Sequence, residues 1–254
     1  MRKAVVLDKS GTIIDPCRIV YNLETGKWLF HVSTLKYVVE KGGVLVNLRG
    51  SASKIMKGDL RGVQLKVSCC AVDPVPRLDR YKLEKPSVVS AVKSVFMKAN
   101  EHCSSELGAC VAVVFDSAGD ITDIVGLGGR LYSDVRGAVS EMRREGVDVY
   151  LATGNCREMT LKCAEVLGMP KYAAIFDASP EDKRALVRRL RGFYGAVIMV
   201  GNDINDLTAM READIAILVL RDGSSPREKL ETEVDYLVGS LTEVAEIVSS
   251  IRPI

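Results

Sequence analysis

The sequence has few histidines, no long apolar run and almost no excess of charge. Its 254 residues include only two histidines, and no two cysteines are spaced as C-x-x-C, so a zinc site is not expected. The longest all-apolar run, residues 109–115, is far shorter than the roughly 20 residues needed to span a bilayer. The formal net charge of +2 argues against a protein built mainly to bind nucleic acid or an anionic membrane.

Cysteine usage and the N-terminal residues favour a cytoplasmic protein. The apolar stretch that follows Arg2 and Lys3 ends at Asp8, which is too short for a secretion signal. We interpret the seven cysteines as reduced thiols, which behave as small hydrophobic residues. Apolar residues make up 47% of the chain and charged residues 27%, and this globular composition excludes a disordered or low-complexity chain.

Short apolar runs alternate with helical patterns after about residue 109. Such alternation predicts a parallel sheet with helices on both faces, which is an α/β fold. The expected strands of this region are residues 111–115, 121–125, 147–151, 173–176, 196–200, 215–220 and 234–238.

The segment before residue 109 has a different rhythm. It combines a predicted hairpin with separate strand-like and helical pieces, at residues 19–32, 44–48, 63–71 and 86–100. The first predicted strand, Lys3–Leu7, is a buried apolar run of the kind found in the later region. We therefore expect a core of residues 1–16 and 109–254, with residues 17–108 inserted as an α+β domain.

A candidate nucleophile directly follows the first predicted strand, in the stretch Asp8-Lys9-Ser10-Gly11-Thr12. Ligands bind at the carboxyl ends of strands in open α/β sheets, and a carboxylate there can attack phosphorus to form an aspartyl phosphate. Gly11 permits a tight turn whose backbone N–H groups hold phosphate oxygens. The alternative interpretation is an aspartate that simply ends a strand in a turn.

Two further segments suit phosphate binding. Thr153-Gly154-Asn155 lies between a predicted strand and a predicted helix, where a hydroxyl and backbone N–H groups form a phosphate site. By itself this tripeptide is also common turn chemistry. Lys183 lies in the first turns of a predicted helix. A cation there does not stabilise the helix, because this end of the helix dipole is positive, so a role in neutralising phosphate charge explains Lys183 better. A solvated surface lysine is the alternative.

Acid and amide side chains gather after the predicted strand at residues 196–200. The stretch runs Gly201-Asn202-Asp203-Ile204-Asn205-Asp206. Clustered oxygen ligands at a strand end suit Mg²⁺, a hard cation, and such a cluster is costly without one. The sequence therefore predicts a magnesium site here.

Taken in order, these segments resemble the motifs of the haloacid dehalogenase superfamily of phosphotransferases. Within that superfamily, residues 8–12 are most similar to the phosphorylation loop of P-type ATPases. Further stretches agree with the same subgroup, at residues 151–155, 179–183, 200–206 and 213–217. The resemblance covers residues 1–16 and 110–254 and implies a Rossmann-like core whose insert acts as a cap.

The resemblance also implies roles for individual residues. Asp8 becomes the nucleophile, assisted by Thr153 and Lys183. The other residues expected to bind phosphate are Lys9, Gly11, Thr12 and Gly154. The residues expected to hold Mg²⁺ are Asp8, Ser10 through its carbonyl, Asn202, Asp203 and Asp206. An ion pump is excluded as a standalone role by the missing membrane helices.

Two departures from the family pattern divide the functional hypotheses. Ser10 stands where most phosphatases of the superfamily carry a catalytic aspartate, and Asn202 stands where an aspartate is usual, with an additional acid at Asp203. The leading hypothesis is a slow Mg²⁺-dependent phosphohydrolase that acts on a small phosphorylated substrate or a nucleotide. The alternative is a weakly active or inactive module that binds Mg²⁺ and phosphate for regulation or interaction. The oligomeric state is left open.

Overall fold

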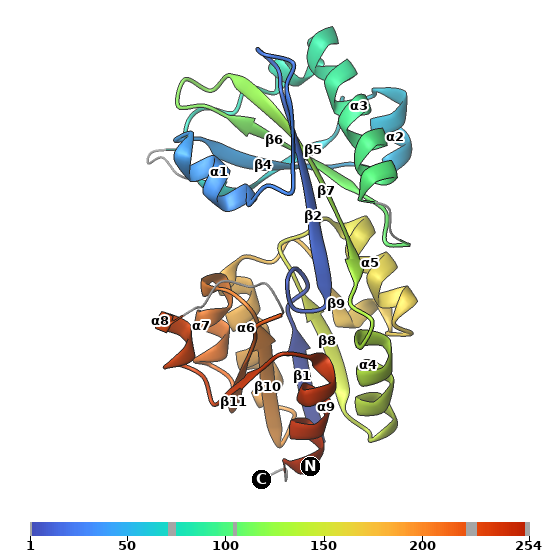
Figure 1. The fold of residues 1–254 in the computed structure, drawn as a ribbon, viewed down its shortest axis with the longest axis vertical. Helices are drawn as coiled ribbons and strands as arrows, with labels where there is room; N and C mark the ends of the chain where they lie inside the picture. The colour runs from blue at the N-terminus through green and yellow to red at the C-terminus, as the bar shows by residue number, and fades with distance from the viewer. Residues whose placement is uncertain (1, 71–74, 104–105, 222–227, 252–254) are drawn as a thin grey trace. The chain divides into compact units, whose positions relative to one another are not determined.

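The chain folds into two compact units, each with its own sheet (Figure 1). The structure is a computed structural model that describes residues 2–70, 75–103, 106–221 and 228–251. Unit 1 comprises Met1–Asp15, Leu131–Asn155 and Thr160–Ile254. Unit 2 comprises Pro16–Arg130 and Cys156–Met159.

Unit 1 is built on six strands in the order β12-β11-β10-β1-β8-β9, and all paired neighbours are parallel. Its strands are β1 (Lys3–Leu7), β8 (Asp148–Ala152), β9 (Ala174–Ile175), β10 (Ala196–Gly201), β11 (Ile215–Val219) and β12 (Tyr236–Val238). β1 lies inside the sheet, where Val5 pairs with Ile198 of β10 and with Val149 of β8. The carboxyl ends of these three strands therefore meet at one edge of the sheet.

Helices flank this parallel sheet, as the alternating pattern predicted. They are α4 (Val135–Arg144), α5 (Arg157–Val166), α6 (Pro180–Arg191), α7 (Leu207–Met210), α8 (Glu228–Glu231) and α9 (Leu241–Ser250), with 3-10 turns η2 (Lys171–Ala173) and η3 (Ile204–Asp206). On one face, Val6 and Met199 pack in a cluster with Val187 of α6 and Met210 of α7. Elsewhere α4 packs against β8 and α9. The α/β fold class is confirmed.

Unit 2 has a second six-stranded sheet, in the order β3-β2-β7-β6-β4-β5. Its strands are β2 (Ile14–Asn22), β3 (Trp28–Phe30), β4 (Val44–Arg49), β5 (Gln64–Cys70), β6 (Cys110–Phe115) and β7 (Ile121–Leu131). Its helices are α1 (Thr34–Glu40), α2 (Ala52–Lys57) and α3 (Pro86–His102), with the 3-10 turn η1 (Arg80–Glu84). The antiparallel pairs include β2–β3, β4–β5, β4–β6 and β6–β7. Residue 71 of the expected strand 63–71 lies outside the described residues.

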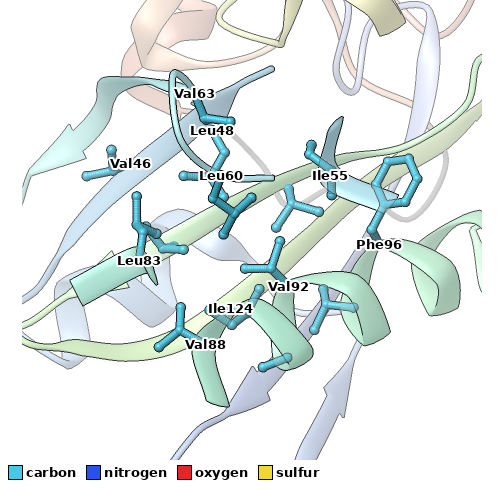
Figure 2. Close-up of a cluster of buried hydrophobic side chains, with 14 of the residues drawn as sticks. Val46, Leu48, Ile55, Leu60, Val63, Leu83, Val88, Val92, Phe96 and Ile124 are labelled. Carbon is cyan, nitrogen blue, oxygen red and sulfur yellow. The ribbon is translucent and has the colours of Figure 1, made fainter. Parts of the chain in front are cut away.

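The core of unit 2 lies between this sheet and α3 (Figure 2). Val46 and Leu48 are two residues apart on β4, and both side chains belong to this cluster, as the two-residue period of a strand requires. Val88 and Val92 contribute from successive turns of α3. Ile55 of α2 belongs to the same cluster. Unit 2 thus has its own hydrophobic core and is an α+β fold.

β6 and β7 belong to the sheet of unit 2, whereas we expected them in the parallel sheet. β6 pairs antiparallel with both β4 and β7, and unit 2 extends to Arg130. The structure therefore differs from the expected boundary at residue 109. The physical reason is that all six residues of β6 are buried. A continuous apolar run of this kind predicts a buried strand but does not determine its sheet.

Four of the cysteines form disulfide bonds, so the expectation that all seven are reduced was wrong. Cys17 is bonded to Cys103, and Cys110 is bonded to Cys156. The partners are 86 and 46 residues apart in the chain, but their Cα atoms are only 5.4 and 6.6 Å apart. These distances lie in the range that a disulfide requires. Sequence spacing cannot report such proximity, because the fold creates it.

Within the described residues, no helix is both long enough and apolar enough to cross a bilayer.

Candidate active site

Asp8 begins a tight buried loop at the end of β1. Its backbone N–H donates to the carbonyl of Val200 in β10, 2.8 Å away. The carbonyl of Lys9 accepts from the N–H groups of Ile13 and Ile14, at 3.0 and 2.9 Å. Asp8 and Lys9 are buried, and these bonds close the chain into a compact turn.

Gly11 and Gly201 allow the close approach of the polar groups around this loop. Gly11 has a φ of +84°, and a Cβ atom there would lie 2.1 Å from the side-chain nitrogen of Asn202. A Cβ atom on Gly201 would lie 2.5 Å from a carboxylate oxygen of Asp206. Both contacts are far shorter than real Cβ contacts, so any larger residue would separate these segments. The structure thus brings Asn202 directly against the loop that follows Asp8.

Lys183 joins the two buried carboxylates of the site. Its Nζ atom donates to Oδ1 of Asp8 at 2.5 Å and to Oδ1 of Asp206 at 2.6 Å. Only 1% of Lys183 is exposed, so it is not a solvated surface lysine. Its position follows from the start of α6, where Ser179 and Asp182 form a capping box.

The two carboxylates keep Lys183 charged. Burial alone would lower the pKa of Lys183, but the charges of Asp8 and Asp206 and their hydrogen bonds raise it above its ordinary value. Burial and the charge of Asp8 raise the pKa of Asp206 to about 6, although Lys183 acts in the opposite direction. With both carboxylates ionised, this buried cluster carries one negative charge in excess.

Asp206 and Asp203 also organise the turn after β10. Oδ2 of Asp206 accepts from the backbone N–H groups of Asn202 and Asp203, at 3.1 and 3.4 Å. Oδ1 of Asp203 accepts from the N–H of Ile204 at 2.8 Å, which caps the turn η3. The additional acid noticed in the sequence therefore has a local structural task.

Thr153 and Ser10 meet at Asn155. The Thr153 hydroxyl donates to Oδ1 of Asn155 at 3.1 Å, and the Ser10 hydroxyl donates to the same oxygen at 3.3 Å. Thr153 is buried and Gly154 follows it in the loop after β8. Asn155 was quoted as part of the tripeptide but not predicted as a site residue. Its place in that tripeptide is a sequence signal, but the pattern does not show that Asn155 joins loops 145 residues apart.

Thr12 has a buried hydroxyl that lacks a hydrogen-bond partner among the described residues. Thr12 itself is fully buried. A buried polar atom of this kind usually has a partner, which can be a bound ligand or an ordered water molecule. The arrangement is compatible with the expected phosphate-binding role of the loop.

The donors around the cluster suit a hard cation. Among the described residues, no three side chains of His, Cys, Asp or Glu are grouped to hold a metal ion. The candidate ligands are instead a mixed oxygen set, which includes the carboxylates of Asp8 and Asp206 and the amide oxygen of Asn202. Mg²⁺ is held in such sites by one or two carboxylates and keeps several water ligands. The excess negative charge and the oxygen donors fit this ion.

Known proteins are similar to this chain in sequence. A family model described as haloacid dehalogenase-like hydrolase matches residues 2–214, a span that includes every residue of the site. A protein of Methanocaldococcus jannaschii described as a soluble P-type ATPase-like phosphatase is 26% identical over 258 residues. That alignment covers 97% of this chain and 93% of the relative.

Proteins described as transporting ATPases are similar to this chain over a part of their own length. A copper-transporting ATPase of Helicobacter pylori is 24% identical over 238 residues, which is 85% of this chain but 29% of the transporter. Among solved structures, the catalytic domain CopB-B of a CPx-ATPase has a TM-score of 0.52 at 12% identity. The match covers 98% of this chain and 90% of the CopB-B domain. At 12% identity the similarity shows a common fold alone.

Proposed function

The chain belongs to the haloacid dehalogenase-like hydrolase family, and on that premise we propose that it is a phosphohydrolase with Asp8 as nucleophile. The family membership and the similarity to the soluble P-type ATPase-like phosphatase confirm the resemblance drawn from the motifs. The expected enzyme class, a hydrolase, is confirmed with it. The single observation that carries the proposed mechanism is the position of Lys183, whose ammonium group bridges Asp8 and Asp206 in a buried site.

We propose that the reaction proceeds in two displacements. First, a carboxylate oxygen of Asp8 bonds to phosphorus, the bond from phosphorus to the ester oxygen breaks, and the leaving oxygen takes a proton from solvent. A water molecule then attacks phosphorus and loses a proton to solvent, the aspartyl–phosphorus bond breaks, and the Asp8 carboxylate is restored with release of phosphate. Lys183 holds Oδ1 of Asp8, which leaves Oδ2 for the attack.

Positive charge and N–H donors make this attack feasible. A carboxylate and a phosphate ester repel each other, so the transition state needs preorganised positive groups. Lys183 supplies a fixed charge, because its raised pKa keeps it protonated. Thr153 and Gly154 in the loop after β8, together with the Lys9–Thr12 loop, are proposed to hold the phosphate oxygens.

Mg²⁺ is the proposed cofactor. The support is the excess negative charge of the buried cluster and the oxygen donors at the same edge of the sheet. The residues that would hold the ion are Asp8, the carbonyl of Ser10, and one or more of Asn202, Asp203 and Asp206. When bound, the ion would polarise the phosphoryl group and offset its charge.

Turnover is proposed to be slow, because Ser10 cannot replace the usual acid. A positioned general acid or base contributes about 10² to 10⁴ in rate, and a serine hydroxyl titrates too far from neutral pH to serve. In this structure the Ser10 hydroxyl is also engaged with Asn155. The aspartyl phosphate should therefore persist.

Unit 2 is proposed to act as the cap that selects the substrate. Its sequence is inserted between β1 and the rest of unit 1, as expected for a cap. A hollow in unit 2 is lined by two cations, Lys57 and Arg61, and by two carboxylates, Asp59 and Glu84. These charges balance, so the proposal that unit 2 selects a small phosphorylated compound or a nucleotide rests on the place of unit 2 in the chain.

A cytoplasmic location remains a proposal, as does the lack of nucleic-acid and membrane partners. The near-neutral charge of the chain supports the latter. The two disulfide bonds bear on the location, because disulfides are rare in cytosolic proteins except in hyperthermophiles. Fractionation of the native source, probed with an antibody against the chain, tests the location directly.

A second function has one observation in its favour. Ser10 and Asn202 replace two expected acids, so the chain could bind Mg²⁺ and phosphate without turning over a substrate. Phosphate release from a panel of small phosphate esters and nucleotides, with Mg²⁺ or with a chelator, separates the two. Binding of inorganic phosphate without hydrolysis of any ester would favour the binding module.

The proposed enzyme is tested by Asp8→Asn. This variant should keep the fold and lose hydrolysis, because the amide cannot attack phosphorus. Glu233→Gln, which alters an exposed ion pair of unit 1, is the control and should retain activity. Equal hydrolysis by Asp8→Asn and the parent would exclude Asp8 as the nucleophile.

A further inference from the structure

Arg221 reaches the loop after Asp8 from two strands away. It follows β11, whereas the loop follows β1, and β10 lies between these strands. The guanidinium group donates to the carbonyl oxygen of Thr12 through two nitrogens, Nε at 3.1 Å and Nη2 at 2.7 Å. Arg221 is 8% exposed, so water competes little for these bonds. Thr12 is thus held by a planar fork from another part of the sheet.

Asp134 and Tyr132 fix the orientation of that fork. Nη1 of Arg221 donates to Oδ2 of Asp134 at 2.9 Å, and the guanidinium carbon lies 4.1 Å from the centre of the Tyr132 ring. Asp134 also accepts from the backbone N–H of Leu241 at 2.6 Å. Burial would raise the pKa of Asp134, but these hydrogen bonds and the charge of Arg221 lower it, so the carboxylate stays ionised.

The neighbouring carbonyl is held as well. The backbone N–H of Tyr132 donates to the carbonyl of Ile13 at 3.2 Å. Two consecutive carbonyls of the loop, those of Thr12 and Ile13, are therefore tied to a frame made of Arg221, Asp134 and Tyr132. The loop is further closed by the N–H of Gly11, which donates to the carbonyl of Ile14 at 2.8 Å.

We propose that Arg221 is a positioning residue, which holds the Thr12 carbonyl and thereby keeps the loop after Asp8 in the conformation that receives the phosphoryl group. The inference rests on the proposed function of Asp8. The carbonyl of Thr12 and the N–H of Ile13 belong to one planar peptide unit, so fixing that carbonyl also fixes the N–H that donates to the carbonyl of Lys9. Misplacement of reacting groups by about 1 Å can cost about 10² in rate. Arg221 touches neither Asp8 nor Lys183 through any described hydrogen bond, so its effect on them is indirect.

A positioning role differs from a purely structural one in what a substitution changes. Arg221→Lys keeps the charge and the pair with Asp134, but a single ammonium cannot reproduce the two-nitrogen contact with Thr12. Arg221→Ala removes all three contacts and leaves a space that a guanidinium ion fits. Arg211→Gln is the matched control, because Arg211 also makes a two-nitrogen contact with a carboxylate, that of Glu233, but does so at the exposed surface.

The first experiment does not depend on activity. Amide hydrogen exchange should become at least about tenfold faster at Gly11, Ile13 and Ile14 in Arg221→Lys. Exchange at Val5 and Val6 of β1 should stay unchanged, and Arg211→Gln should match the parent at all five amides. Unchanged exchange in the loop of Arg221→Lys would overturn the proposal, and so would equal acceleration across β1, which would signal general destabilisation.

The second experiment uses hydrolysis of p-nitrophenyl phosphate with Mg²⁺. Arg221→Lys should lower kcat by about 10- to 100-fold and change KM less than about threefold. Added guanidinium ion at low millimolar concentration should restore part of kcat in Arg221→Ala but not in Arg221→Lys. A loosened loop with unchanged kcat in Arg221→Lys would overturn the proposal. A parent that hydrolyses no ester would instead overturn the proposed function, and the exchange experiment would still decide whether Arg221 orders the loop.

Discussion

The hydroxyl of Ser10 donates a hydrogen bond to the side-chain oxygen of Asn155, 3.3 Å away. The hydroxyl of Thr153 donates to that oxygen too, at 3.1 Å. This shared acceptor connects the loop after β1 to the loop after β8. Ser10 occupies the position of the usual acid. Its contact with Asn155 needs a hydrogen-bond donor at position 10, and a carboxylate there would not donate.

Ser10→Asp should speed steady-state phosphate release by about tenfold or more, because a carboxylate can activate the water that attacks the aspartyl phosphate. Asn155 must then turn its amide to present the NH₂ group to the new carboxylate. Acid-trapped phosphoenzyme should fall as turnover rises. Ser10→Ala serves as the control and should show no gain. Fast turnover of the parent without a trappable intermediate would refute this account of Ser10.

Lys183→Met should abolish hydrolysis and also destabilise unit 1. Removing the Lys183 ammonium group leaves the buried carboxylates of Asp8 and Asp206 without their cation. Breaking a buried ion pair in this way lowers the free energy of unfolding by about 3–5 kcal/mol. The free energy of unfolding in urea measures the effect.

The double variant Lys183→Met with Asp206→Asn separates stability from catalysis. It removes one of the two stranded charges, so it should recover a part of the lost stability while hydrolysis stays absent. If the double variant were no more stable than Lys183→Met, the electrostatic explanation of the destabilisation would fail.

Gly11→Ala should lower both activity and stability. The new methyl group would meet the side chain of Asn202, and the φ of +84° is a conformation that alanine adopts only with strain. Gly137→Ala is the matched control, since Gly137 lies in α4 with no atom within 4 Å of a built Cβ. That variant should stabilise the protein by about 0.5–1 kcal/mol and leave hydrolysis unchanged. Thermal unfolding and phosphate release measure the two effects, and equal behaviour of both variants would contradict the steric argument.

Asp123 should make the free energy of unfolding of unit 2 depend on pH. Burial would raise the pKa of Asp123, but hydrogen bonds from Lys41, Thr122, Asn22 and Tyr37 lower it below its ordinary value of 3.8. Because the pKa is lower in the folded state, the stabilisation is fully present above the unfolded value and is lost as the pH falls through the folded one.

Asp123→Asn isolates this contribution. At pH 7 the variant should be less stable than the parent by about 1–3 kcal/mol. The difference should shrink as the pH falls below about 4. Urea unfolding followed by the fluorescence of Trp28, the single tryptophan, reports on unit 2. A difference that is constant from pH 7 down to pH 3 would contradict the assignment.

Sequence patterns predicted the elements of unit 1 well, because its strands are short apolar runs and three of them, β1, β8 and β10, lead into a recognisable polar motif. Asp8 and Thr153 follow β1 and β8, and Lys183 lies in the first turn of α6, as expected. Sequence patterns could not show which distant segments of the chain become neighbours in the fold. A buried run such as β6 does not state which sheet it joins, and the spacing of Cys17 and Cys103 says nothing of their proximity.

The same limit applies to residues that act through a single contact. Arg221 belongs to no quoted motif. Asn155 does belong to one, but its contact with Ser10 arises only because the sheet places it beside a distant loop. Sequence motifs therefore named residues that the structure brings together, such as Asp8, Lys183 and Asp206, but they did not show which other residues hold them in place.

The central place of β1 has a consequence for biosynthesis. Val5 pairs with Val149 and Ile198, so at about 5–20 residues per second the strand that precedes Asp8 waits roughly 10 to 40 s for its second neighbour to be made. Residues 16–130 emerge meanwhile as one continuous stretch and can bury the core of unit 2 first. A ribosome that stalls in between would expose both edges of an apolar strand, and the nascent chain would then depend on chaperones to avoid aggregation.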